Sequence, residues 1–285
     1  TQITAEHFVD GMDEDMVETG PDYDLPASCR EGLYGVGSVL GVSGARAVNL
    51  VQKNFLQKNR VQIPLLFMHD AIHGYRTIFP IPLALSCSFD QELLRKVGRC
   101  TAKELRATGI LVDFSPMTDL VRDARWGRVM ESFGEDHLLS GNLGRAMIEG
   151  YQNSSDGSLG EDGVAACVKH FAAYGAACGG RDYGPVDMSW REFFGYYAMP
   201  YEIALKANPR FVMSSFNSLN GEPATASRYL LEEVLRERFG FEGIVISDWS
   251  AVAELLNQGI AADGREAAKA ALTAGVEIEM TSALI

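Results

Sequence analysis

The hydrophobic pattern of the chain alternates between two kinds of segment. Seven short runs are almost continuously apolar, which is typical of parallel strands that are buried on both faces. They span residues 36–42, 63–70, 109–116, 164–171, 210–217, 243–249 and 275–280. The segments between them have helical spacing, over residues 45–59, 91–108, 137–152, 191–207, 226–239 and 265–274. This alternation predicts an α/β protein made of βαβ units around a parallel sheet.

Polar residues gather at the ends of several predicted strands. His69-Asp70, Lys169-His170, Asn217 and Asp248 each follow an apolar run. A doubly wound sheet binds its ligand at one switch point, whereas a barrel collects functional side chains from many strand ends onto one face. The pattern therefore favours a (β/α)8 TIM-like barrel, for which about 250 residues are enough.

The two ends of the chain depart from a complete barrel. Eight acidic residues and no Lys or Arg occur between Glu6 and Asp24, so we expect residues 1–34 to form an irregular acidic arm without the first strand. Residues 35–285 then form the barrel domain. Only TSALI follows the last apolar run, so the last helix is expected to be missing, and the strand to be covered by further chain or by a partner.

Composition and charge narrow the possible ligands. The net charge is −13 and the pI is about 4.8, which argues against nucleic acid and anionic membranes as partners, because both require clustered basic residues. A neutral or cationic small molecule fits better. The five cysteines are scattered without a C-x-x-C pair, and no apolar run reaches the roughly 18 residues of a membrane helix.

Several candidate residues have both a functional and a structural interpretation. Asp248 either caps the following helix or presents its carboxylate to a ligand. Lys169 and His170 either point into a barrel mouth or serve as a solvated lysine and a structural histidine. The run RDARWGRVMESFGED (122–136) holds either buried arginines that bind hydroxyl or carboxylate groups, or a surface network of ion pairs.

Two familiar site motifs are not supported. The segment HDAIH (69–73) has Asp where the H-E-x-x-H zinc motif has its Glu, and it follows a strand instead of lying in a helix. Leu40 takes the place of the third glycine in a dinucleotide-binding loop. We therefore expect no metal and no organic cofactor.

Five motifs, in this order and spacing, resemble the barrel domain of glycoside hydrolase family 3, most like its bacterial periplasmic β-glucosidase type. They are MHDAIHG (68–74), RDARWGRVMESFGED, CVKHFAAYG (167–175), MSSFNSLNGEPAT (213–225) and ISDWSAVAEL (246–255). The resemblance covers about residues 35–282. Ala124 replaces a proline that is usual in the second motif.

The resemblance implies a role for each matching residue. Asp248 matches the catalytic nucleophile, and Asp70, Arg128, Lys169 and His170 match residues that bind the hydroxyls of one sugar. Met213, Phe216 and Trp249 match the wall around that sugar. Such a site suits glycosidic cleavage, because an ionised carboxylate stabilises an oxocarbenium-like transition state and can then bond to the anomeric carbon.

The resemblance also implies a retaining, exo-acting β-glycosidase that releases glucose from β-glucosides. Retention requires a second carboxyl about 5–5.5 Å from the first. Two-domain relatives take it from a domain after the barrel, and single-domain relatives have a D-S-H histidine in the loop where this chain has Asp187-Met188-Ser189. We therefore expect the acid to come from a missing second domain or another chain.

Two alternatives to this enzyme remain open at the level of sequence. A barrel aldolase would use Lys169 as a Schiff-base amine, and a sugar-binding fragment would bind without catalysis. The chain begins at Thr1 rather than Met, so a leader could already have been removed. A periplasmic or secreted location is favoured slightly over a cytoplasmic one.

Overall fold

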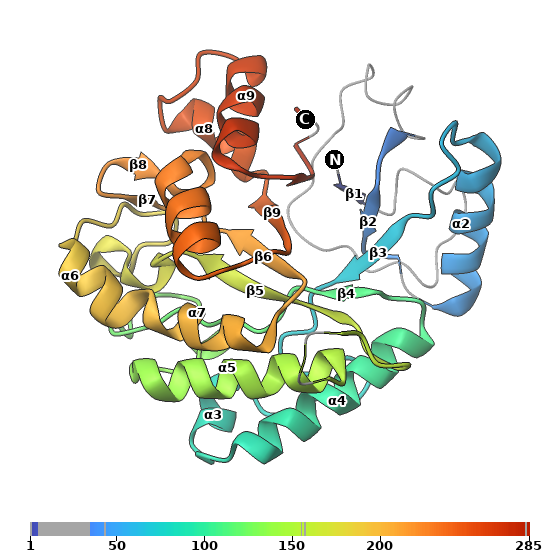
Figure 1. The fold of residues 1–285 in the computed structure, drawn as a ribbon, viewed down its shortest axis with the longest axis horizontal. Helices are drawn as coiled ribbons and strands as arrows, with labels where there is room; N and C mark the ends of the chain where they lie inside the picture. The colour runs from blue at the N-terminus through green and yellow to red at the C-terminus, as the bar shows by residue number, and fades with distance from the viewer. Residues whose placement is uncertain (1, 5–34, 43, 155, 157, 283) are drawn as a thin grey trace.

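The chain folds as a closed barrel of eight parallel strands (Figure 1). The computed structural model describes residues 2–4, 35–42, 44–154, 156, 158–282 and 284–285. The strands follow one another around the barrel in chain order: β1 (Gln2–Thr4), β2 (Ser38–Leu40), β3 (Leu66–His69), β4 (Val112–Asp113), β5 (Ala165–Phe171), β6 (Phe211–Ser214), β9 (Ile244–Trp249) and β10 (Ile278–Met280). The predicted barrel and its seven predicted strands are confirmed.

One part of the prediction for the N-terminal arm is wrong. Residues 1–34 do contain a strand, because β1 pairs with β2 on one side and with β10 on the other. Three residues are too few to show a hydrophobic period, so only pairing with two distant strands identifies β1. The acidic residues between Glu6 and Asp24 lie outside the described residues. Among residues 281, 282, 284 and 285 no helix follows β10.

Helices cover the outside of the barrel at each predicted position. They are α2 (Ala45–Lys58), α4 (Gln91–Ala107), α5 (His137–Gln152), the helical series α6 (Trp190–Glu192), Phe193–Tyr197, α7 (Met199–Ala204) and Leu205–Ala207, the helix Tyr229–Arg238, and α9 (Gly264–Ala274). Helix α8 (Ala251–Asn257) is the helix that the capping interpretation of Asp248 implied, whereas α3 (Pro82–Ser86) and the hairpin of β7 (Ser218–Leu219) and β8 (Glu222–Pro223) were not predicted. Over the described ranges no helix is long and apolar enough to cross a membrane.

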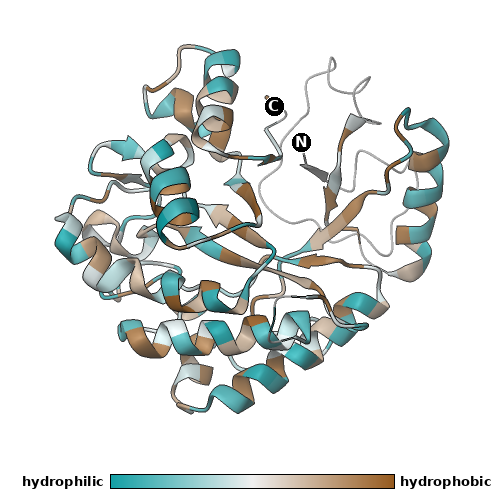
Figure 2. Ribbon diagram, in the orientation of Figure 1, coloured by the Kyte–Doolittle hydropathy of each residue, from teal (hydrophilic) through white to brown (hydrophobic). Residues whose placement is uncertain are grey.

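The strands are apolar on both faces because each face is buried in a different cluster. One cluster fills the barrel interior, with members such as Leu40, Cys167 and Ile246. The other lies between the strands and the helices, with members such as Val168 and Val245. Figure 2 shows apolar residues on the strands and polar residues on the outer faces of the helices.

This alternation fixes the direction of the residues that follow. Side chains two positions apart on a strand point to the same face. Lys169 is two residues after Cys167, and Asp248 is two residues after Ile246, and both of these earlier residues belong to the interior cluster. The sequence therefore directs Lys169 and Asp248 to the inner side, at the carboxyl end of the barrel.

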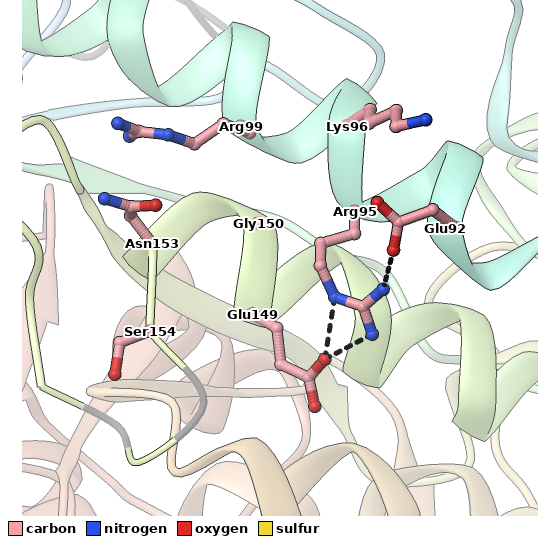
Figure 3. Close-up of a pocket in the computed structure, with 8 residues that line it drawn as sticks. All are labelled: Glu92, Arg95, Lys96, Arg99, Glu149, Gly150, Asn153 and Ser154. Atoms are coloured by element: carbon pink, nitrogen blue, oxygen red, sulfur yellow. Dashed lines mark hydrogen bonds and ion pairs between the residues drawn. The ribbon is translucent and has the colours of Figure 1, made fainter.

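Helices α4 and α5 pack against each other beneath the sheet in the view of Figure 1. Side chains Asp90 and Asp136 cap their N-termini, accepting from Leu93 N at 3.0 Å and Leu139 N at 2.7 Å. A surface pocket lies between the two helices (Figure 3). In it, Arg95 joins the helices by donating to Glu149 Oε2 from Nε at 3.0 Å and Nη2 at 2.7 Å.

Candidate active site

Asp248 lies at the end of β9 with its two carboxylate oxygens in different surroundings. The residue is 7% exposed. Oδ1 accepts a hydrogen bond of 2.6 Å from Trp249 N. Oδ2 has no hydrogen-bond partner among the described residues, and it lies 3.5 Å from His170 Nε2. A buried carboxylate oxygen without a partner is costly, so Oδ2 is available to a ligand.

The helix-capping interpretation of Asp248 is wrong. Helix α8 begins at Ala251, and its N-cap is Ser250, with no side-chain capping bond. An N-cap side chain accepts from the amide two or three residues ahead, whereas the Asp248 carboxylate accepts from its immediate neighbour.

Lys169 is buried in an ion pair, not extended to solvent. Its side chain is 1% exposed, and Nζ donates to Asp70 Oδ2 at 2.7 Å. Burial acts to lower the pKa of Lys169, but the Asp70 carboxylate outweighs it and the pKa lies above its ordinary value. Lys169 is therefore a fixed cation, and its charge is balanced by the carboxylate of the more exposed Asp70.

His170 is held on one side and open on the other. Asp119 Oδ2 accepts from the His170 backbone N at 2.9 Å and lies 2.8 Å from Nδ1. Burial, reinforced by the charges of Arg128 and Lys169, lowers the pKa of His170 well below its ordinary value, so the ring is neutral. A neutral ring that donates Nδ1–H to Asp119 has a lone pair on Nε2, which can accept a hydrogen bond from a ligand hydroxyl.

The arginines of the run 122–136 have different surroundings. Arg125 pairs with Asp123 at the surface, and Arg122 lies 4.0 Å from Glu192. Arg128 is largely buried and donates to both oxygens of Glu131, from Nε at 2.7 Å and from Nη2 at 2.9 Å. The surface-network interpretation therefore holds for the first two arginines, and the buried interpretation holds for Arg128.

The charges of this group act on one another. Burial raises the pKa of Asp248 to about 6, against the opposing effects of Arg128, the Trp249 amide and Lys169. The guanidinium of Arg128 lies 5.7 Å from the centre of the Tyr174 ring, and that ring makes an edge contact with His170 at 5.3 Å. His170 therefore lies against Asp248, Arg128 and Lys169 act on its charge, and Asp70 joins the group through Lys169.

The three predicted wall residues occupy two layers. Met213 belongs to the interior cluster and is 2% exposed. Phe216 belongs to a separate aromatic cluster with Trp126 and Tyr174, and the half-buried Trp249 packs against both clusters. Phe216 and Trp249 thus lie together at the mouth, because Trp249 packs against the cluster that contains Phe216. Met213 lies in the packed interior.

Sequence reasoning missed the residues that support the site from behind. Asp119 is fully buried, and burial raises its pKa to about 6. The Tyr201 hydroxyl lies 2.6 Å from Asp119 Oδ1 and 2.5 Å from the His170 carbonyl oxygen. Asp113 Oδ1 accepts from Ala71 N at 2.8 Å and so fixes the chain just after Asp70. A signal existed for Asp113, which is a carboxylate inside an apolar run, but not for Tyr201.

The arrangement suits recognition of a neutral polyol. It offers one carboxylate oxygen without a partner, a guanidinium, an ammonium and an imidazole acceptor. Within the ranges that the structure describes, no group of three or more His, Cys, Asp or Glu side chains is placed to bind a metal ion.

Comparison with known proteins gives a consistent result. The family model described as the glycosyl hydrolase family 3 N terminal domain matches residues 33–284. The chain is 41% identical over 267 residues to the periplasmic beta-glucosidase of Salmonella typhimurium, covering 93% of this chain and 34% of that protein. It is 36% identical over 233 residues to a beta-xylosidase of Formosa agariphila, covering 78% of this chain and 32% of that one.

Solved structures agree with the sequence comparison. The crystal structure of a beta-glucosidase from Listeria innocua in complex with isofagomine matches with a TM-score of 0.91 and 46% identity, covering 99% of this chain and 38% of that chain. The same protein in complex with glucose matches with a TM-score of 0.88 and 44% identity, over 99% and 39%. The chain spans about a third of the length of the curated relatives named here.

Proposed function

Because this chain belongs to glycosyl hydrolase family 3, we propose that it is the nucleophile-bearing barrel of a retaining, exo-acting β-glucosidase. The observation that carries the proposal is the carboxylate of Asp248, with Oδ2 unpartnered among the described residues and the cations of Arg128 and Lys169 acting on it. Some relatives are named beta-glucosidases and others beta-xylosidases; we propose glucose as the sugar. The names of relatives also support a periplasmic location.

The proposed reaction uses the charges already in place. Asp248 Oδ2 attacks the anomeric carbon, the bond to the aglycone oxygen breaks, and a covalent glycosyl-enzyme forms. Asp70, Arg128, Lys169 and His170 bind sugar hydroxyls, and these bonds can strengthen as the ring distorts towards the transition state. Trp249 and Phe216 supply apolar faces for the ring, with Met213 in the layer that supports them.

The proposal also assigns the general acid to a group outside these 285 residues. Asp70 acts on the pKa of Asp248 but is paired with Lys169. Glu131 is held by both nitrogens of Arg128, and although burial acts to raise its pKa, Arg128 keeps that pKa below its ordinary value. A carboxylate held in an ion pair is a poor proton donor, so neither residue suits the acid role.

The aldolase alternative is not favoured by the state of Lys169. A Schiff base requires a neutral amine, whereas Lys169 is paired with Asp70 and its pKa is raised. A sugar-binding role without catalysis is the second candidate, because the chain spans about a third of its relatives. Glucose would then raise the melting temperature, and no adduct would form with a reactive glycoside.

Covalent labelling tests the nucleophile without needing a general acid. We expect 2,4-dinitrophenyl 2-deoxy-2-fluoro-β-glucoside to add one fluoroglucosyl group to the chain, measured by intact mass, because dinitrophenolate leaves without protonation. Peptide mapping should place the group on Asp248. Asp248→Ala should abolish the adduct.

Two comparisons make this test specific. Glu242→Ala removes an exposed carboxylate that lies shortly before the same strand, and it should label like the unsubstituted chain. Asp248→Asn keeps the shape of the side chain and should fold without labelling. An adduct on the Asp248→Ala variant at the normal rate would refute the assignment.

A further inference from the structure

Tyr183 presents an exposed aromatic ring beside the proposed sugar site. Its side chain belongs to the loop after β5, and the residue is 53% exposed. The ring centre lies 4.4 Å from that of Phe216, with the two planes tilted by 46°. Phe216 is only 5% exposed. The buried ring therefore supports the exposed one from behind and leaves much of the Tyr183 ring open.

The loop on the N-terminal side of Tyr183 is anchored to the aromatic cluster. Asp182 Oδ1 accepts from Trp126 Nε1 at 2.9 Å and from the hydroxyl of Tyr174. Both of these aromatic residues are buried. Tyr174 in turn contacts the rings of His170 at 5.3 Å and Phe216 at 5.7 Å. The same cluster thus borders the proposed site and fixes the backbone next to Tyr183.

The C-terminal side of the loop is anchored as well. Pro185 O accepts from Cys178 N at 3.1 Å, and Val186 N donates to Ser218 O at 2.9 Å. Val186 also forms a parallel bridge with Leu219 of β7. Tyr183 itself has φ of 60°, a conformation that tyrosine rarely adopts. The loop therefore holds the ring in one place, so little conformational entropy is lost when a ligand packs on it.

The position of Tyr183 relates it to the nucleophile. Burial raises the pKa of its hydroxyl, and the negative charge of Asp248 raises it further, so the two groups are within electrostatic reach. Phe216, which supports the ring, shares the apolar cluster against which Trp249 packs. Single exposed aromatic residues are common on protein surfaces, but this one is anchored on both sides and lies within electrostatic reach of Asp248.

We propose that Tyr183, supported by Phe216, is a platform for the aglycone, the ring on the far side of the glycosidic bond from the sugar held by Asp70 and Lys169. The inference rests on the proposed function and adds a second binding position to it. A flat apolar surface suits an aryl group or the C–H face of a second pyranose. The site would therefore favour glycosides with a ring-shaped aglycone over those with a small one.

Two labelling reagents separate the aglycone from the sugar. One is 2,4-dinitrophenyl 2-deoxy-2-fluoro-β-glucoside, whose leaving group is a ring, and the other is 2-deoxy-2-fluoro-β-glucosyl fluoride, whose leaving group is one atom. We expect Tyr183→Ala to lower the ratio of their second-order labelling constants, aryl over fluoride, by about 3- to 10-fold. Tyr183→Phe keeps the ring and should keep the ratio.

The matched control is Tyr196→Ala. Tyr196 is 44% exposed, in the helical segment Phe193–Tyr197, and its removal should not change the ratio. Melting temperatures of the variants show that each is folded. An equal loss with both reagents, or no loss with either, would overturn the platform. If neither reagent labels the unsubstituted chain, the proposed function itself fails, and the platform fails with it.

Discussion

At the scale of single residues, the environment of Asp248 sets opposing demands on one carboxyl group. The proposed nucleophile must be ionised to attack, yet burial raises the pKa of Asp248 to about 6 from an ordinary 3.8. Arg128 and Lys169 act in the other direction. The site therefore depends on buried cations to keep Asp248 charged near neutral pH.

These opposing effects predict a pH dependence for labelling. The raised pKa means that Asp248 is protonated below about pH 6, so the labelling rate should rise through that pH and level off above it. Arg128→Gln removes the charge that most opposes burial, so the midpoint should move to higher pH. The measurement is the labelling rate, followed by intact mass from about pH 4 to about pH 9. This interval covers the range in which carboxyl groups with a shifted pKa titrate.

Arg125→Gln is the matched control for the pH profile. Arg125 is exposed and pairs with Asp123 at the surface, so its removal should leave the midpoint in place. A midpoint that moves down in the Arg128 variant, or that moves equally in both variants, would contradict this account of the site.

The site residues that the sequence predicted and those that it did not predict differ in how far along the chain their partners lie. Asp70, Lys169, His170 and Asp248 stand at the ends of apolar runs, so local pattern alone predicted their common edge. Tyr201 reaches Asp119 from 82 positions away in the chain. No local pattern contains that pairing, because it arises only when the helices pack around the barrel.

At the scale of elements, the strands that could be predicted are those that are long enough and buried enough to form an apolar run in the sequence. Ile244, Val245 and Ile246 are apolar because β9 is buried on both faces. β1 is defined instead by backbone pairing with β2 and β10, which places few demands on sequence. The bounds of the short helix α8 were not predicted, because its seven residues are too few to show a clear helical period.

The packing of α4 on α5 depends on glycine at the crossing. A Cβ atom at Gly150 would lie 2.3 Å from Arg95 O, and one at Gly98 would lie 2.7 Å from Met147 O. Real Cβ atoms do not approach backbone oxygens so closely, and the helices would have to separate. That movement would also disturb the Arg95 and Glu149 ion pair of Figure 3.

We therefore expect Gly150→Ala to destabilise the chain by about 1–3 kcal/mol, the usual cost of overpacking. Urea unfolding followed by circular dichroism measures the change. Gly195→Ala is the control, because a Cβ atom there meets nothing within 4 Å and alanine has the higher helix propensity. Equal stability of the two variants would show that the helices can separate at little cost.

At the scale of the whole molecule, the charge distribution separates surface from site. The chain has a net charge of −13, while the buried Lys169 and the largely buried Arg128 act as cations on the carboxylate of Asp248. Anionic partners are repelled over long range, and a neutral sugar is not. Under the proposed function, the barrel holds the sugar and forms the glycosyl-enzyme, and we expect it to lack the group that activates water.

That expectation predicts how the isolated chain should behave in turnover. With 2,4-dinitrophenyl β-glucoside the first step needs no acid, so we expect a burst of dinitrophenolate followed by slow release of the sugar. Azide needs no general base, so it should raise the steady rate by roughly 100-fold, the lower range for a general base. The product should be β-glucosyl azide, because two displacements retain configuration.

The anomeric configuration of the azide distinguishes the possible outcomes. In Asp248→Gly, azide would occupy the place of the missing carboxylate and attack the substrate directly, giving the α-azide by one displacement. Cellobiose has a poor leaving group and should remain intact with the unsubstituted chain, with or without azide. Rapid hydrolysis of cellobiose, unaffected by azide, would place the general acid within these 285 residues and remove the need for a second domain.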